Sequence, residues 1–566
     1  MSSRPRKGFP LPASVCALVC ATTFAHAQTP PDAGSLLRES ERTLRETPAV
    51  PVVPPAPPMK EAAKGASVKV AAFRIEGATL LPADELAGLL ADHIGRTLSF
   101  AELEQAARRI AEHYRTHGWF ARVYLPAQDV TDGVVRIQIV EGRFGGALIE
   151  RDNGTRADAD LIQRLAAGRL KTGEPFSAAD LERGLLLAND QPGIRATGIL
   201  EAGDAPGETR LRLKLTDGPR FAGDAGLTNH GTRATGREQV TAGLAWNPGD
   251  GSQASLRALA ATDLALVRLA YARPLGGDGL RWSIHASDLN YRLGGDFKAL
   301  NAKGNAQTWG LDLAWPIQRA ADRNLSLTAT AEQRRYADDS LGTALRRKQI
   351  DALQFALNGD RIDGLGGGGL TQASLVLAAG DLDLSGNAAD LTADRAGPRA
   401  HGAYGKLNAR LARLQNLPAG FALHADLSAQ WADGNLDSSE QFVLGGPNGV
   451  RAYPVSEAGG DEGWLLTLEL RKEVSPGWTA MGFLDGGEIR QHKRPWAGWN
   501  AGGNVPNRYG LAGAGIGLNW NKPGDYSVQL TLAAPLGGHP GKTAAGKNQD
   551  GSAREARAWL RATKYF

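Results

Sequence analysis

The stretch "GFALHADLSAQW" (420–431) decides the fold class that the sequence predicts. From Phe421 to Trp431 every second residue is apolar, whereas the alternate positions include His424 and Asp426. A period of two is the repeat of a β-strand, in which successive side chains point to opposite faces of the sheet. The segment is therefore predicted to be a strand with one apolar face and one face that carries ionisable groups.

The same alternation recurs from about residue 221 to the C-terminus. Examples are "NLSLTATAEQRRY" (324–336), "GWLLTLEL" (463–470) and "YSVQLTL" (526–532), and turn signals such as "NPGDGS" lie between the strands. Charges on one face of strand after strand suit the polar lumen of a barrel whose other face meets lipid. We therefore predict a mostly β protein with a C-terminal transmembrane antiparallel β-barrel of about 16 strands over residues 219–566. The alternative is a secreted β-sandwich.

The segment 1–27 is typical of a secretory signal peptide. Basic residues precede an apolar stretch, and the small-x-small sequence from Ala25 to Ala27 is a cleavage signal. The two cysteines, Cys16 and Cys20, lie in this segment, so disulfides and thiol chemistry are not expected in the mature chain. Three of the 64 basic residues also lie here, which leaves 61 against 60 acidic residues. A nearly neutral chain without a cluster of Lys and Arg is not expected to bind nucleic acid.

Residues 28–67 are predicted to hold a short polar helix and a linker. Over residues 32–47 the charges interleave, with Glu41 placed for an i,i+4 pair with Arg45, and the apolar edge is narrow. Such a helix suits a wet, polar surrounding, and the alternative is a disordered leader. The Pro-rich stretch "TPAVPVVPPAPPMK" (47–60) is expected to be an extended, semi-rigid tether.

Two similar units follow, over residues 68–142 and 143–218. Each is about 75 residues long, which is enough for a modest core, and each has the order strand, helices, strand, strand. The predicted elements of the first unit are the strand 70–77, a helix over 99–117 and the strand 135–142. The helix of the first unit is predicted to have one apolar face, formed by Leu103, Ala107, Ile110 and Tyr114. In the second unit Leu181, Leu185 and Ala188 repeat this face, and "TRLRLKLTDG" (209–218) repeats the strand.

This order of segments resembles the outer-membrane transporters of two-partner secretion (TpsB type, the hemolysin secretion/activation proteins). The two units look like POTRA domains, and the likeness covers nearly the whole mature chain, including "RFAGDAGLTNHG" where the barrel begins. The resemblance implies an outer-membrane protein with its N-terminal domains in the periplasm and a plug-like N-terminal helix. It also implies a secreted exoprotein partner of the TpsA type, contact with outer-membrane lipids, and insertion by the barrel-assembly machinery.

Two motifs carry the resemblance most specifically. The first corresponds to the family's Val-Arg-Gly-Tyr/Phe at the tip of an inward-folded loop and comprises Gly449, Val450, Arg451, Ala452 and Tyr453. The second corresponds to Phe-x-Asp-x-Gly on an inward-facing strand and comprises Phe483, Asp485 and Gly487. By analogy with the family, Arg451 is expected to meet Asp485. Ala452 stands where the family has Gly, and it would be strained if that position needed a positive φ.

Physical reasoning from the residues leads to the same pair but leaves an alternative. A period of two places the second motif on one face, and its carboxylate belongs in the lumen, where a guanidinium can bind it through two hydrogen bonds. Glycines at 513, 515 and 517 leave one face of a nearby strand bare for another backbone. The alternative is a solvated Arg451 and an Asp485 that is one more lumen charge.

The resemblance implies a translocation pore that recognises an unfolded exoprotein through its POTRA domains and exports it. The alternatives are a barrel-assembly insertase and a porin or uptake channel. We find no nucleophile elbow and no acid–base pair, so neither catalysis nor a cofactor is predicted. His113 and His117, i and i+4 on a predicted helix, can chelate a metal. No Glu follows His113, and two imidazoles near a helix end are the favoured interpretation, so no metal site is predicted.

Overall fold

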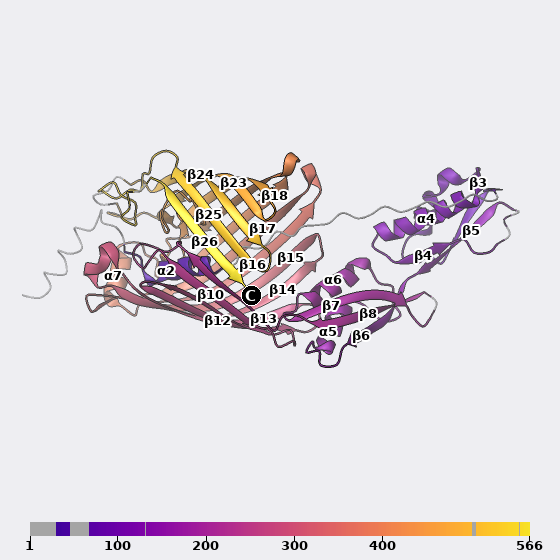
Figure 1. Ribbon diagram of the computed structural model, residues 1–566, viewed down its shortest axis with the longest axis horizontal. Helices are drawn as coiled ribbons and strands as arrows, with labels where there is room; N and C mark the ends of the chain where they lie inside the picture. Colours follow the sequence, from indigo (N-terminus) through magenta and orange to yellow (C-terminus); the bar gives the residue numbers. More distant parts are fainter. Residues whose placement is uncertain are drawn as a thin grey trace, which may run out of the picture.

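The computed structural model describes residues 30–45, 67–128, 130, 132–205, 207–500, 505–553 and 555–566. The predicted signal peptide and Pro-rich tether lie outside these residues. A barrel and two small units are seen side by side in Figure 1, with the C-terminus on the barrel wall. No helix in the described part of the chain is both long enough and apolar enough to cross a membrane.

Sixteen antiparallel strands close into one barrel, so the predicted fold class is confirmed. Neighbours in the barrel follow the chain order, and β26 pairs with β9 to close it. At the seam the Phe566 amide donates to the Gly223 carbonyl oxygen at 3.0 Å. The strands are β9 (Phe221–Thr228), β10 (Gln239–Trp246), β11 (Gln253–Ala261), β12 (Leu264–Leu275), β13 (Leu280–Arg292), β14 (Lys303–Arg319), β15 (Arg323–Ser340), β16 (Thr343–Asp363), β17 (Gly369–Asp383), β18 (Gly402–Asn416), β19 (Phe421–Ala432), β22 (Glu462–Ser475), β23 (Trp478–Arg490), β24 (Arg508–Lys522), β25 (Tyr526–Pro535) and β26 (Arg557–Tyr565).

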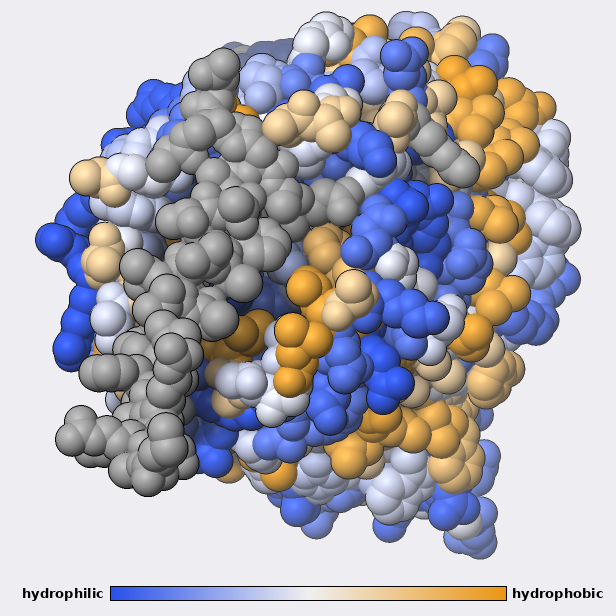
Figure 2. All heavy atoms as spheres, turned by 90° about the vertical axis from the view of Figure 1, so that its left-hand side faces the viewer, coloured by the Kyte–Doolittle hydropathy of each residue, from blue (hydrophilic) through white to orange (hydrophobic). Residues whose placement is uncertain are grey.

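The alternation of residues 420–431 becomes the two faces of β19. Leu427 and Trp431 are exposed on the outer wall, whereas Gln430 is buried and donates to the carbonyl oxygens of Glu440 and Asp461, both at 3.0 Å. Figure 2 views the barrel from the end opposite the two small units, where hydrophobic residues gather along the right-hand edge and hydrophilic residues lie to the inside of them. The wall is therefore apolar outside and polar inside.

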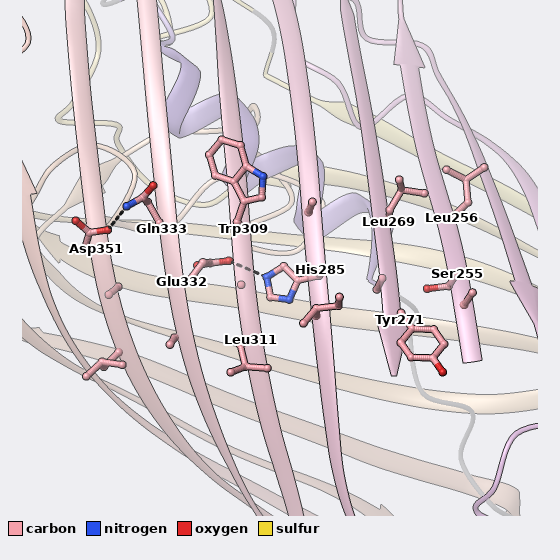
Figure 3. A pocket seen from close by; sticks show the side chains of 18 of the residues that line it. Ser255, Leu256, Leu269, Tyr271, His285, Trp309, Leu311, Glu332, Gln333 and Asp351 are labelled. Carbon is pink, nitrogen blue, oxygen red and sulfur yellow. Dashed lines mark hydrogen bonds and ion pairs between the residues drawn. The ribbon is translucent and has the colours of Figure 1, made fainter. Parts of the chain in front are cut away.

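The outer wall is hollowed over β10 to β17 by a cavity of about 1300 Å³ (Figure 3). Exposed apolar side chains such as Leu269, Trp309 and Leu311 line it. On the inward face of these strands, His285 Nε2 of β13 lies 3.2 Å from Glu332 Oε1 of β15, and both side chains are largely buried. Polar side chains on these two strands thus lie one residue away from outward apolar positions, as the period of two requires.

Each of the two N-terminal units is a three-stranded mixed sheet with two α-helices packed on it. The sheet orders are β2-β5-β4 and β6-β8-β7, with β2–β5 and β6–β8 parallel. The first unit contains β1 (Ser67–Lys69), β2 (Ala72–Glu76), α3 (Ala83–Gly88), η1 (Ala91–His93), β3 (Thr97–Ser99), α4 (Phe100–Thr116), β4 (Ala121–Tyr124) and β5 (Val134–Glu141). The second contains β6 (Arg143–Arg151), α5 (Ala159–Ala167), α6 (Ala178–Asn189), β7 (Ile194–Ala202) and β8 (Glu208–Asp217).

The predicted helix over residues 99–117 is α4, and it begins at a capping box. The Ser99 hydroxyl accepts from the Glu102 amide at 3.3 Å, and Glu102 accepts from the Ser99 amide at 2.7 Å. Its predicted apolar face is buried, with Ile110 and Tyr114 fully so. The remaining elements are α2 (Ala33–Leu44), η2 (Gly295–Leu300), η3 (Leu365–Gly367), α7 (Ala388–Ala396), η4 (Pro418–Gly420), β20 (Phe442–Val443) and β21 (Gly459–Gly460). The helix α7, which lies between β17 and β18, was not predicted from the sequence.

The second unit is joined to the barrel by ion pairs as well as by the chain. Arg319 at the end of β14 donates to both carboxylate oxygens of Asp190, each at 2.8 Å. Arg183 of α6 is buried and donates to Asp278 Oδ1 at 3.0 Å in the turn between β12 and β13. These pairs place α6 against the turns at one end of the barrel (Figure 1).

Glu141, the last residue of β5, connects β5 to α4 and to the segment before α3 through hydrogen bonds. Its Oε1 accepts from the amides of Thr79 at 2.7 Å and Leu80 at 2.8 Å, and from the Tyr114 hydroxyl at 2.9 Å. Burial raises the pKa of the Glu141 carboxyl, but the hydrogen bonds outweigh burial and hold this pKa below its usual value. The ionised carboxylate therefore stabilises the first unit.

We predict that this stabilisation is present at neutral pH and is lost as the pH falls below about 4, through the lowered pKa. Glu141→Gln is expected to lower the free energy of unfolding of the first unit by about 1.5–3 kcal/mol at pH 7. Hydrogen exchange at the Thr79 and Leu80 amides in the full chain measures the change. Equal protection of these amides in the variant and the parent at pH 7 would contradict the assignment.

Candidate functional site

Residues 433–461 fold back into the barrel between β19 and β22, and we call them the inward loop. Within the loop, β20 pairs with β21 in a small antiparallel sheet. Its tip needs Gly449, because a Cβ there would lie 1.9 Å from the Leu444 carbonyl oxygen. This close approach lets the Val450 amide donate to the same oxygen at 2.6 Å. The tip is therefore a tight turn that its backbone defines.

The tip places the Arg451 guanidinium on the Asp485 carboxylate, as predicted. Arg451 Nε donates to Asp485 Oδ2 at 2.9 Å and Nη2 donates to Oδ1 at 2.7 Å, which makes a bidentate pair. The Arg451 amide also donates to Oδ2, at 3.1 Å. The Phe483 ring lies against the guanidinium, with 3.5 Å between Arg451 Cζ and the ring centroid. All three side chains are buried.

Glu469 of β22 is a second acceptor that the sequence analysis missed. Its Oε1 accepts from Arg451 Nη1 at 2.6 Å, and its Oε2 accepts from Arg471 Nε at 2.8 Å. Trp559 of β26, also missed, donates from Nε1 to the Arg451 carbonyl oxygen at 2.7 Å. Alternation along β22 places Glu469 on the inward face with Thr467, but it does not say which inward groups meet the loop.

Apolar burial holds the rest of the tip. Val450, Ala452 and Tyr453 are at most 2% exposed. The Tyr453 ring also meets the His539 ring edge-on, with 5.1 Å between centroids. The other members of this apolar cluster are Phe442, Leu444, Ala458, Leu465, Phe483, Ile489, Tyr509, Leu511 and Ala533. The predicted motif residues are thus brought together in one small core inside the barrel.

Gly513 of β24 makes the space that Ala452 occupies. A Cβ at Gly513 would lie 2.6 Å from Ala452 Cβ and 3.4 Å from Val450 Cγ1. Ala452 does not have a positive φ, so the strain considered for this position does not arise. Alanine fits at the tip because the facing strand carries glycine.

The other predicted glycines have different neighbours. A Cβ at Gly487 would lie 2.6 Å from Leu444 Cδ2, so Gly487 lies under the base of the loop tip. Gly515 and Gly517 lie opposite larger side chains of β23 and make room for those. Of the three glycines expected to receive another backbone, Gly513 contacts the loop tip.

The helix α2 lies inside the barrel next to the inward loop, rather than forming a disordered leader. Its N-cap residue Asp32 accepts from Lys348 Nζ at 3.1 Å, from Arg346 Nη1 at 2.8 Å and from the Ser438 hydroxyl at 2.6 Å. Lys348 and Arg346 belong to β16, whereas Ser438 belongs to the loop. One carboxylate therefore joins α2 to the barrel wall and to the loop.

Further polar contacts run along α2. Arg38 donates from Nη1 to the Gln441 carbonyl oxygen at 3.1 Å, and Arg268 of β12 donates to Glu41 Oε1 at 3.1 Å. The narrow apolar edge, Leu36, Leu37 and Leu44, is buried against inward apolar side chains of the barrel. A polar cavity of about 640 Å³ remains between α2 and the wall. Charged groups that line it include Arg257, Arg268, His285, Glu332 and Arg334.

Comparison with known proteins identifies the family. The profile of the haemolysin secretion/activation proteins ShlB/FhaC/HecB matches residues 207–520, and that of the ShlB-type POTRA domain matches residues 68–142. The chain belongs to the haemolysin secretion/activation family. It is an outer-membrane transporter with its POTRA domains in the periplasm, and it exports a partner exoprotein through its pore. The family supports export over the insertase and porin alternatives.

Individual relatives agree with this assignment. The heme/hemopexin transporter protein HuxB of Haemophilus influenzae (strain 86-028NP) is 30% identical over 465 residues, which cover 80% of each chain. The outer membrane transporter CdiB of Escherichia coli is 25% identical over 524 residues, 88% of this chain and 84% of CdiB. The solved structure of CdiB from Escherichia coli covers 95% of this chain and all of its own, with a TM-score of 0.71 and 20% identity. At that identity the structure shows the shared fold alone.

We predict that Arg451→Ala inserts normally but fails in export. The change leaves the buried carboxylates of Glu469 and Asp485 without their common cation, which costs about 3–5 kcal/mol. This loss is small beside the hydrogen bonds of a closed barrel but is enough to release the loop tip. Heat-modifiable migration in gels measures the barrel, and the amount of exoprotein in the medium measures export. Arg451→Lys, which keeps the charge without the bidentate geometry, is expected to be intermediate. Normal export by Arg451→Ala would refute the role given to the pair.

We also predict that Gly513→Ala impairs export and that a second change repairs it. The new Cβ overlaps the Ala452 side chain, and such overpacking costs about 1–3 kcal/mol. Ala452→Gly in the same chain removes the overlapping atom, so the double variant is expected to regain most of the lost export. The comparison is the amount of exported partner from the single and double variants. A double variant no better than Gly513→Ala would show that this contact is not what matters.

Proposed function

We propose that this transporter rests with its pore occupied by α2 and the inward loop, and that export requires α2 to leave while the loop tip stays. The observation that carries the proposal is the difference in how the two are held. The tip is attached at both ends to barrel strands and is part of a buried apolar core. The helix is held by ion pairs at its N-cap and along its side, with three leucines on one edge.

An ion pair can break at little net cost where water can enter the lumen and hydrate both charges. The cost is typically about 0–1 kcal/mol for each pair. The pair of Glu41 with Arg268 is of this kind, because both side chains line the cavity beside α2. Asp32 and Lys348 are buried, so their pair is not of this kind. The Arg451 pair lies under an apolar cluster that excludes water, and its rupture is far more costly. Because the tip is also attached to barrel strands at both ends, an arriving polypeptide is expected to displace α2 first.

Recognition of the exoprotein is proposed to occur at an edge strand of a POTRA domain. An extended chain adds to a free edge through main-chain hydrogen bonds, which do not demand a particular sequence. In the second unit β6 is bulged between Phe144 and Ala147, whereas β7 runs without a register shift along β8. Ile199 of β7 is also exposed. We therefore favour β7 as the edge that receives the partner.

The surroundings of the barrel supply the rest of the proposed cycle. The exposed apolar side chains of the wall are proposed to contact outer-membrane lipids, and the barrel-assembly machinery is proposed to insert the chain. The periplasm offers no nucleotide, so folding of the exoprotein outside the cell is the proposed driving force. The partner is proposed to be a TpsA-type protein encoded nearby.

A reversible cross-link tests whether α2 must leave. A Cβ at Gly34 would lie 2.7 Å from Ser439 Cβ, so cysteines at both positions need only a small shift to reach the disulfide separation of about 3.8 Å. Because both natural cysteines lie in residues 1–27, Gly34→Cys with Ser439→Cys is the sole pair expected in the mature chain. We expect export to stop when the pair is oxidised and to return on reduction.

Each single cysteine variant is the matched control and is expected to export in both redox states. Export that continues through the oxidised double variant would refute the displacement of α2. Deletion of residues 68–218 separates export from simple diffusion. The deleted chain is expected to lose export, whereas a porin would keep its flux of small solutes.

A further inference from the structure

Three side chains with metal-binding atoms converge in the first unit, far from the pore. His113 and His117 lie one turn apart near the end of α4, and Glu85 comes from α3. Glu85 Oε1 lies 2.7 Å from His113 Nε2 and 3.8 Å from His117 Nε2. One ligand atom of each residue lies within 4.8 Å of the others. Within the described ranges of the chain, this is the one group of three or more His, Cys, Asp or Glu residues that meets this condition.

The backbone already orients one of the imidazoles. His117 Nδ1 lies 2.9 Å from the His113 carbonyl oxygen. A carbonyl oxygen can only accept, so Nδ1 carries the proton and the Nε2 of a neutral ring presents its lone pair near Glu85. A lone pair beside a carboxylate oxygen is favourable only when a cation or a proton lies between them. An imidazole whose other nitrogen donates to a backbone carbonyl is also the usual arrangement at metal sites.

The core of the unit positions the ligands before any ion binds. Leu86 of α3 and Tyr114 of α4 are fully buried in the same apolar cluster. Glu85 precedes Leu86 and His113 precedes Tyr114, so packing of the two helices sets the separation of the carboxylate and the imidazole. The ligands come from two elements that a shared core already holds together.

We propose that Glu85, His113 and His117 form a zinc site. Two imidazole nitrogens and one carboxylate oxygen are a ligand set that zinc uses when its fourth position is left to water. Glu85 and His117 are exposed, so the fourth position faces solvent and accepts water or a group from another molecule. The bound ion joins α3 to α4 and stiffens the first unit. Two histidines alone did not favour a metal in the sequence, and Glu85 is what the tertiary structure adds.

The test uses the full chain in detergent, purified through a tag without histidine and stripped of metal with a chelator. Zinc is titrated in competition with a colorimetric zinc chelator. We expect one zinc ion per chain, and a decrease in affinity of at least about 10–100-fold for Glu85→Gln and for His117→Gln. His93→Gln is the matched control, because His93 lies in the same unit but pairs with Asp92 at 2.8 Å. This control is expected to bind zinc as the parent does.

A structural measurement accompanies the titration. Zinc is expected to slow hydrogen exchange over residues 83–93 and 113–118 in the parent and in His93→Gln, and to have no such effect in His117→Gln. X-ray absorption at the zinc edge is expected to show two imidazole ligands. A chain that retains no zinc, or one whose zinc affinity is unchanged in both Glu85→Gln and His117→Gln, would overturn the proposal.

Discussion

Hydrocarbon offers no hydrogen-bond partner to a polypeptide backbone, and the whole structure depends on meeting this constraint. The chain satisfies this constraint by pairing sixteen strands in a closed ring. Strand β26 pairs with β9, and the Phe566 amide donates a hydrogen bond to the Gly223 carbonyl oxygen. Closure also separates the side chains. Along each strand, every second side chain faces outward and is apolar. The alternate side chains face the lumen, where ionised groups can lie together. The helix and the loop lie in that space, and the periplasmic units are attached at one end of it.

Two kinds of contact fill the lumen, and their difference is the basis of the proposed export cycle. The loop tip combines a bidentate ion pair with a small apolar core, so Arg451 and Asp485 are protected from water. The α2 helix contacts the wall through ion pairs, some of them beside a polar cavity of about 640 Å³, and through one narrow apolar edge. A segment held in this way can be exchanged for hydrated ions and an arriving polypeptide, whereas the tip cannot leave without exposing its core.

The sequence predicted part of the site and missed the rest for a physical reason. The pairing of Arg451 with Asp485 came from two family motifs, and alternation placed Asp485 on the inward face. Glu469 and Trp559 were missed because they lie on other strands, and nothing local distinguishes them from other inward residues. Ala452 fits at the tip because Gly513 lies opposite it, on a strand that is remote in the sequence. In the first unit the spacing of His113 and His117 predicted a pair on one helix, but the nearby carboxylate of Glu85 comes from a different helix.

The sequence by itself determined the strand alternation, the buried face of α4, the order of the segments and the barrel class, since each depends on a local period or a motif. The tertiary structure alone decided that α2 lies as a helix in the lumen and that Arg451 contacts two carboxylates. It also decided that Glu85 lies beside two imidazoles. Such contacts join residues that are remote in the chain. They depend on strand register across the closed ring and on helix packing in the small core, which no local pattern records.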